Sequence, residues 1–197
     1  MKALALFDFD GTLTKKDSLA DFIHFAVGTR KMVAGAFMLS PVFAAYAFKL
    51  MHNGAAKEKV LQHFFANWKI TDLTAIADCY ALHRIPTILR PGALEKIQWH
   101  LNHGHTVTVV SASPEIWLKA WTQSQGIGLI GTRLEEDNGR FSGRYAGQNC
   151  HGNEKVRRIR ERYDLHMFEK IYAYGDTPGD KPMLALAHEA FYRPFRR

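Results

Sequence analysis

The feature that most limits what this chain can fold into is a short apolar run at residues 3–9, which ends around two aspartates, Asp8 and Asp10. An apolar run of this length, followed by Gly11 as a turn signal, predicts a fully buried β-strand. Carboxylates there are costly unless their charge is compensated, and neighbouring like charges raise each other's pKa. A bound cation would solve both problems, so this strand end is a candidate metal site.

The rest of the chain reads as one long helical block followed by alternating strands and helices. Apolar residues recur at helical spacing over about residues 17–84, with turn signals at Gly28 and Asn53–Gly54. The segments predicted as later strands are 105–113, 129–145 with a hairpin turn at 137–139, 170–176 and 190–195. Alternation of this kind predicts an α/β fold with a parallel sheet covered by helices on both faces. We expect residues 1–14 and 86–197 to form this core and residues 15–85 to form a helical insert.

Polar or acidic side chains stand at three predicted strand ends, at Asp8, Ser111 and Asp176. Parallel sheets bind ligands beyond the carboxyl ends of their strands, so we expect these residues to meet at one edge. Asp8 could attack phosphorus, and Asp8 and Asp176 could hold Mg²⁺. Asp10 could move a proton to and from the reacting oxygens. Taken alone, an Asp-x-Asp sequence is also compatible with a solvated turn or a helix cap.

Two further segments fit the same site. Lys155 is predicted in the first turn of a helix at 153–164, where a cation opposes the helix dipole, so it is expected to pair with Asp8 and a phosphate. Asp180 could orient Lys155 or a metal-bound water. A helix starting at Pro114, capped by Ser113, would offer a phosphate site beside the strand end. A solvated lysine and helix-capping aspartates are the alternatives.

The composition of the chain is less informative than its motifs about which molecules it binds. The net charge of +7 fits a phosphorylated substrate, an acidic membrane surface or nucleic acid. Residues 32–48 carry no charge, but the run is shorter than the ~20 residues of a membrane span and is interrupted at Ser40–Pro41. We expect a buried helical hairpin there, with a surface-seeking helix as the alternative. The cluster of His100, His103 and His105 is expected to be solvated.

Two distant cysteines and the lack of a recognisable signal peptide favour a cytoplasmic protein, with the inner face of a membrane as a possible site of action. The sequence leaves the oligomeric state open.

The ordered motifs resemble those of the haloacid dehalogenase superfamily. They are Asp8-Phe9-Asp10-Gly11-Thr12, Ser111, Lys155, and Gly175-Asp176 with Asp180. The helical insert resembles the C1-type cap of the phosphoserine-phosphatase-like branch. The resemblance implies a Rossmann-like core, a phosphoryl group carried by Asp8, acid–base catalysis by Asp10, and Mg²⁺ held by Asp8, Asp176 and the Asp10 carbonyl. It also implies phosphate contacts from Ser111, Ala112 and Lys155, with supporting contacts from Thr12 and Asp180.

The substrate remains open at this level. The segment 150–156, CHGNEKV, resembles the third motif of bacterial phosphatidylglycerophosphate phosphatases, which favours a lipid phosphate and a cap that touches the membrane surface. A small soluble ester such as phosphoserine is the alternative, with Arg30 as a candidate contact for its carboxylate. Phosphotransfer shares the same intermediate and stays possible, whereas three intact acids disfavour dehalogenation. A different class of function is nucleic-acid binding through the basic stretch 155–162, which we rank lower.

Overall fold

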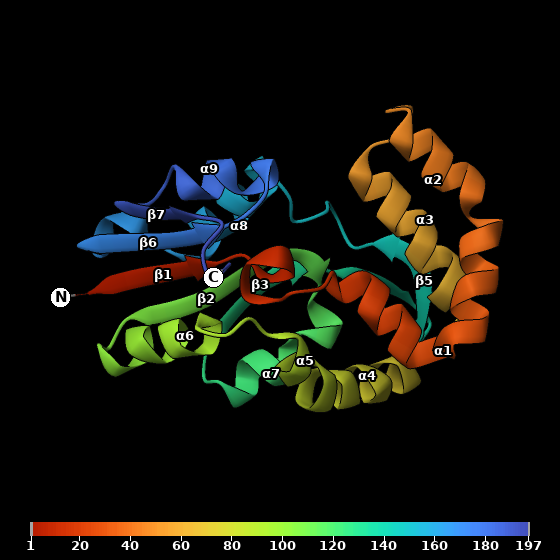
Figure 1. The fold of residues 1–197 in the computed structure, drawn as a ribbon, viewed down its shortest axis with the longest axis horizontal. Helices are drawn as coiled ribbons and strands as arrows, with labels where there is room; N and C mark the ends of the chain where they lie inside the picture. Colours follow the sequence, from red (N-terminus) through yellow and green to blue (C-terminus); the bar gives the residue numbers. More distant parts are fainter. Residues whose placement is uncertain (1, 197) are drawn as a thin grey trace.

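The computed structural model describes residues 2–196 and has a parallel five-stranded sheet at its centre (Figure 1). In spatial order the strands are β3 (Gly128–Thr132), β2 (Thr106–Pro114), β1 (Ala3–Phe7), β6 (Lys170–Gly175) and β7 (Glu189–Tyr192). All neighbouring pairs are parallel. The predicted α/β class is therefore confirmed, and the apolar run that opens the chain forms the central strand.

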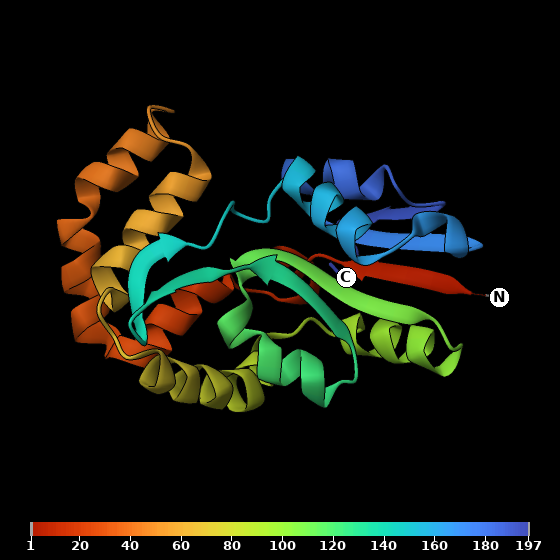
Figure 2. The ribbon, with the colours of Figure 1, turned by 180° about the vertical axis from the view of Figure 1, so that it is seen from behind.

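Helices cover both faces of the sheet (Figures 1 and 2). The flanking helices are α6 (Ala93–Asn102), α7 (Lys119–Ser124), α8 (Asn153–Arg162) and α9 (Lys181–Leu184). Alternate residues of β1 point to opposite faces, so Phe7 belongs to one apolar cluster and Leu6 to the other. This double burial explains why the strand is apolar at every position.

A helical lobe lies beyond the carboxyl ends of the strands (Figure 1). Its helices and the connection back to the sheet are α1 (Ser18–Met38), α2 (Ser40–Ala47), α3 (Asn53–Phe65), α4 (Ile70–Cys79) and α5 (Ile85–Ile88). Gly28 interrupts α1 with φ of 78°, a conformation that glycine adopts without strain, and Pro41 stands in the first turn of α2. The predicted turn signals therefore mark real breaks in the helical block.

A β-hairpin from the second half of the chain packs against this lobe. Its strands are β4 (Leu134–Asp137) and β5 (Arg140–Tyr145), and Asn138 and Gly139 form the predicted turn with positive φ. The Tyr145 N–H donates to Glu58 Oε1 of α3 at 2.8 Å. Because this hairpin shares contacts with α3, the division of the chain at residues 14 and 86 stays a prediction.

The prediction of a buried hairpin at residues 32–48 is wrong. The second half of α1 and α2 do not fold back on each other but form one bent helical arm, which packs against α3, and the hydrogen-bond ladder continues through Leu39. Helix α2 has no buried residue, and Phe37, Met38 and Phe48 are strongly exposed. One side of the arm faces α3 and the interior of the lobe, and no described element covers its other side. Among the helices of residues 2–196, none is both long and apolar enough to cross a membrane.

The prediction that the histidine cluster is solvated is wrong for His100. This side chain is fully buried, and its two ring nitrogens lie 2.9 Å from the Tyr174 hydroxyl and 2.8 Å from His105 Nδ1. His100 follows Ala93 and Ile97 at helical spacing, which places it on the inner face of α6. A polar residue on that face is tolerated because both of its nitrogens have partners.

Candidate active site

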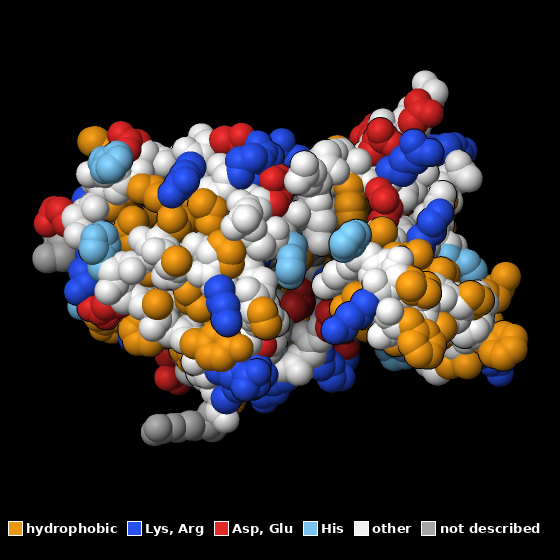
Figure 3. Space-filling model, turned by 90° about the horizontal axis from the view of Figure 1, so that it is seen from above, with side chains coloured by type: hydrophobic (Ala, Val, Ile, Leu, Met, Phe, Trp, Pro, Cys, Tyr) orange, Lys and Arg blue, Asp and Glu red, His pale blue; other side chains and the backbone are white. Residues whose placement is uncertain are grey.

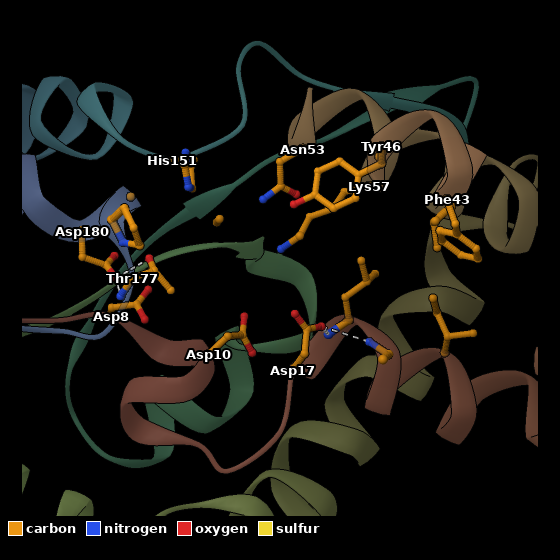
Figure 4. A pocket seen from close by; sticks show the side chains of 18 of the residues that line it. Asp8, Asp10, Asp17, Phe43, Tyr46, Asn53, Lys57, His151, Thr177 and Asp180 are labelled. Carbon is orange, nitrogen blue, oxygen red and sulfur yellow. Dashed lines mark hydrogen bonds between the residues drawn. The ribbon is translucent and has the colours of Figure 1, made fainter. Parts of the chain in front are cut away.

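The register of the sheet brings the three predicted strand ends to one edge. Phe7 pairs with Val109 on β2 and with Tyr174 on β6, so Asp8, Ser111 and Asp176 all follow at the same end of the sheet. Asp8 and Asp176 are almost fully buried. The expected convergence is therefore present, and it places acidic groups where the sheet faces the helical lobe (Figure 4).

Lys155 joins two of the acids. Its Nζ lies 2.6 Å from Asp8 Oδ1 and 2.7 Å from Asp180 Oδ1, and its side chain is only 1% exposed. A buried ammonium is tolerated only with such partners, which accounts for a lysine in the first turn of α8. The predicted pairing of Lys155 with Asp8 is thus present, and Asp180 holds the lysine from the other side.

Thr12 links Asp8 to Asp176. Its hydroxyl lies 2.9 Å from Asp8 Oδ2 and 3.2 Å from Asp176 Oδ1. The turn that carries Thr12 passes so close that a Cβ on Gly11 would meet Asp176 Oδ2 at 2.6 Å, and Gly11 has φ of 81°. Glycine at this position therefore satisfies both a left-handed backbone and a close approach.

Asp180 is the most fully engaged of the carboxylates. Its Oδ2 accepts hydrogen bonds from the Asp176 N–H, the Thr177 N–H and the Thr177 hydroxyl, at 3.1, 2.9 and 2.7 Å. Its Oδ1 accepts a hydrogen bond from Lys155 Nζ. Asp8 and Asp176 share the single proton of the Thr12 hydroxyl, and each accepts one further hydrogen bond, from Lys155 and from Arg196, so these two carboxylates retain more free acceptor capacity than Asp180.

The cluster has the charge and the donor atoms of a divalent-cation site. Oxygen atoms from Asp8, Asp176 and Asp180 all lie within 4.8 Å of one another. Burial raises the pKa of Asp8 to about 7, even though Lys155 opposes the shift. Burial alone would lower the pKa of Lys155, but Asp8 and Asp180 raise it. Hard carboxylate oxygens with a surplus of negative charge fit Mg²⁺, which would favour the ionised form of Asp8.

Asp10 stands apart from this cluster and faces the cavity beside it. Its Oδ1 accepts from the Ser18 N–H at 2.6 Å, and its Oδ2 accepts from the Ser113 hydroxyl at 2.5 Å. Burial raises the pKa of Asp10, and the charge of Asp17 acts in the same direction. A carboxyl group with a raised pKa and fixed orientation is suited to carrying a proton.

The expected helix cap at Ser113 is wrong. Strand β2 continues to Pro114, which still pairs with Thr132 of β3, and α7 begins only at Lys119 after a short 3₁₀ turn. A phosphate site at a helix starting from Pro114 is therefore absent from the described chain. Ser111 is buried, and its hydroxyl accepts from the Ser113 N–H at 3.0 Å. Ala112 lines the cavity, whereas Ser111 does not.

Sequence reasoning did not identify several residues at the site. Arg196 Nη2 lies 2.6 Å from Asp176 Oδ2, and Arg90 Nε donates to the Gly11 carbonyl at 3.0 Å. Lys57 of α3 lines the cavity, as does His151. Arg30, the candidate carboxylate contact, is exposed and does not line it. None of these placements has a local sequence signal, because each depends on how distant elements pack.

A cavity of about 760 Å³ extends from the acidic cluster into the helical lobe (Figure 4). Its polar end includes Asp8, Asp10 and Lys155. The residues that line its other end are mostly apolar and come from α1, α2 and α3: Leu19, Ile23, Met32, Phe43, Val60 and Phe64. Asp17 and Lys57 add one charge of each sign between the two ends, as Figure 4 shows.

The chain is similar to known proteins over nearly its whole length. The sequence profile of the haloacid dehalogenase-like hydrolases matches residues 5–185. Protein CicA of Caulobacter vibrioides is 37% identical over 197 residues, covering 98% of this chain and 86% of CicA. Phosphoserine phosphatase SerB1 of Mycobacterium tuberculosis is 28% identical over 201 residues, covering 96% of this chain and 64% of SerB1. The crystal structure of a protein with unknown function from Bordetella pertussis Tohama I has a TM-score of 0.84 and 25% identity, covering 96% of this chain and 89% of that one.

Proposed function

The chain belongs to the haloacid dehalogenase-like hydrolases and is a phosphatase of that family, and from this premise we propose that it cleaves phosphomonoesters through a phosphoryl group carried on Asp8. The observation that carries the proposal is the ion pair between Asp8 and the fully buried Lys155 at the inner end of the cavity. It provides a nucleophile, and a cation beside the position of an incoming phosphate.

Asp8 and Asp10 act in two successive displacements at phosphorus. The carboxylate of Asp8 attacks phosphorus while the bond from phosphorus to the leaving oxygen breaks, and Asp10 donates a proton to that oxygen. Asp10 then takes a proton from a water molecule that attacks the same phosphorus, which breaks the bond to Asp8 and releases phosphate. Ser18 and Ser113 keep Asp10 oriented through both steps.

Asp8, Asp176 and the Asp10 carbonyl are the groups that would hold Mg²⁺, as the family resemblance implies, and Thr12 and Asp180 support them. Bound there, Mg²⁺ supplies charge neutralisation for the phosphate. Lys155 and the backbone at Ser111 and Ala112 would contact the phosphate from the protein side.

The lining of the cavity favours a phosphate ester with an apolar leaving group, such as a lipid phosphate. Met32, Phe43 and Phe64 lie at the end of the cavity away from Asp8, where the alcohol part of the substrate would be bound. Burial of acyl or aromatic groups against an apolar surface of this kind makes the free energy of binding more favourable. A second candidate is a phosphoserine-like ester, favoured by Asp17 and Lys57, which could pair with an amino group and a carboxylate.

The nucleic-acid alternative loses support from the contacts of the basic stretch. Arg157 and Arg158 both pair with Glu154, and Arg158 also donates to the Gly131 and Gln148 carbonyls. Arg162 donates to the Leu129 carbonyl. These arginines stabilise the protein itself, which leaves less of their hydrogen-bonding capacity for phosphates.

The first test is Mg²⁺-dependent release of p-nitrophenol from p-nitrophenyl phosphate. Asp8→Asn keeps the size of the side chain but removes the nucleophile, so we expect turnover to fall by about 10⁴-fold or more, to the background rate. Asp72→Asn changes an exposed aspartate on α4 and should leave turnover unchanged. Full activity in Asp8→Asn would overturn the proposal. Relative kcat/KM for a lipid phosphate in detergent and for phosphoserine then separates the two substrate classes.

A further inference from the structure

The bent arm formed by the second half of α1 and by α2 makes a helical hairpin with α3, and this arm is apolar on two sides. On its inner side Met32, Phe43 and Tyr46 line the cavity. On its outer side, five large apolar side chains are between 64% and 82% exposed: Val33, Phe37, Met38, Phe48 and Leu50. We call these five residues the outer hairpin surface. A helix that is apolar all round is normally buried in protein or lipid, so this surface indicates an interface that the chain does not complete by itself.

The charged residues that flank the outer hairpin surface in the sequence are all of one sign. Arg30 and Lys31 precede the uncharged run and Lys49 follows it. Between residues 22 and 57 the sequence contains no aspartate or glutamate. Figure 3 shows hydrophobic side chains gathered on this lobe with Lys and Arg side chains at its margins. Apolar residues bordered by cations fit a surface with an apolar interior and anionic head groups.

We propose that the outer hairpin surface docks onto an anionic lipid membrane. Phe37, Met38 and Phe48 enter the boundary between head groups and acyl chains, and Arg30, Lys31 and Lys49 contact the head groups. The docking does not depend on the identity of the phosphate ester that is cleaved. It has a consequence for the proposed lipid substrate, however, because the same two helices form the apolar wall of the cavity. A phosphate amphiphile could then reach the site from the membrane surface.

The test is co-sedimentation of the full chain with vesicles of phosphatidylcholine alone and of phosphatidylcholine mixed with phosphatidylserine. We expect binding to the mixed vesicles that weakens as salt is raised. The double variant Phe37→Ser/Phe48→Ser should bind these vesicles at least about tenfold more weakly than the wild-type chain does. Neither residue lines the cavity, so hydrolysis of p-nitrophenyl phosphate, measured without vesicles, should be unchanged.

A matched control separates this surface from exposed apolar residues in general. Leu82→Ser/Met167→Ser removes two exposed apolar side chains outside the hairpin and should retain wild-type vesicle binding. A charge test, Lys31→Glu/Lys49→Glu, should abolish the preference for phosphatidylserine.

Three outcomes would overturn the proposal. The wild-type chain could fail to bind mixed vesicles, the Phe37/Phe48 variant could bind them as well as wild type, or light scattering could show a dimer that dissociates in that variant. The last result would assign the surface to a second copy of the chain. Because vesicle binding is read without turnover, loss of the proposed enzymatic function would leave this result intact, and the reverse also holds.

Discussion

The acidic cluster at the strand ends and the outer hairpin surface break the ordinary rules of burial in opposite directions. In the first, Asp8, Lys155 and Asp180 are charged groups inside the protein. In the second, Phe37 and Phe48 are apolar groups in contact with solvent. Among the described residues, no buried side-chain nitrogen or oxygen lacks a hydrogen-bond partner, so the charged groups of the cluster are bonded to other groups of the protein. The outer hairpin surface has no partner within the described chain.

This difference indicates where each region obtains its stability. The buried charges depend on one another, since loss of one partner leaves an uncompensated charge away from water. The exposed apolar side chains contribute little to folding, because they are nearly as accessible in the folded chain as in an unfolded one. The first region is therefore expected to be sensitive to single substitutions and the second tolerant of them.

The largest effect is expected for Lys155→Met, which retains an unbranched side chain and removes the charge. The negative charges of Asp8 and Asp180 would face each other without compensation, at a cost of about 3–5 kcal/mol in the free energy of unfolding. Turnover of p-nitrophenyl phosphate should fall to background. Urea denaturation measures the first quantity. Lys59→Met, at an exposed position of α3, is the control and should unfold like wild type. Equal stability of the two variants would show that the cluster is not held by Lys155.

A pair of phenylalanine substitutions compares the two regions directly. Phe22 is fully buried and stacks on Trp117 with ring centroids 4.7 Å apart, whereas Phe37 is 82% exposed. Phe22→Ala should lower the free energy of unfolding by about 3–5 kcal/mol because it opens a cavity. Phe37→Ala should change it by no more than about 0.5 kcal/mol. A large loss in Phe37→Ala would mean that the outer hairpin surface is covered in solution, for instance by a second copy of the chain.

The two regions also differ in how far the sequence predicts them. The apolar strand, its acidic end and the lysine at the start of α8 are each encoded within a few residues, and the order of strands and helices predicts that their ends meet. That reasoning places Asp8, Asp176 and Lys155 at one edge of the sheet, as the structure has them. The catalytic roles of these residues remain predictions that the substitutions above test.

Features that depend on tertiary packing were predicted poorly. Residues 32–48 have the composition of a buried segment, and only the arrangement of α1, α2 and α3 reveals that one side stays exposed. Ser113 resembles a helix cap in sequence, yet pairing with β3 extends β2 past it and turns its hydroxyl toward Asp10. Arg196 lies after the end of β7 and contacts Asp176, and no spacing rule connects two residues 20 positions apart across a helix and a strand.

The smallest expected effect is a dependence of stability on pH, and it arises from a buried histidine on α6, beside the sheet. Burial lowers the pKa of His100 to about 4, and the charges of His105, Lys96 and His103 add to the shift. An unfolded histidine has a pKa near 6.5. Between these two values the unfolded chain binds a proton that the folded chain does not, so stability falls as pH falls, by about 3 kcal/mol from this residue.

The contribution of His100 can be isolated by substitution. Asp8 acts in the opposite direction, since its raised pKa makes the folded chain bind the extra proton, so the prediction concerns the difference between variants. Urea denaturation from pH 7 to 4 should show a shallower loss of stability toward acid in His100→Gln than in wild type. Phe37→Ala should keep the wild-type slope, because residues 32–48 contain only Tyr46 as a titratable side chain. An unchanged slope in His100→Gln would mean that the buried imidazole takes up its proton in the folded chain as readily as in the unfolded one. Its hydrogen bonds to Tyr174 and His105 would then not be holding it neutral.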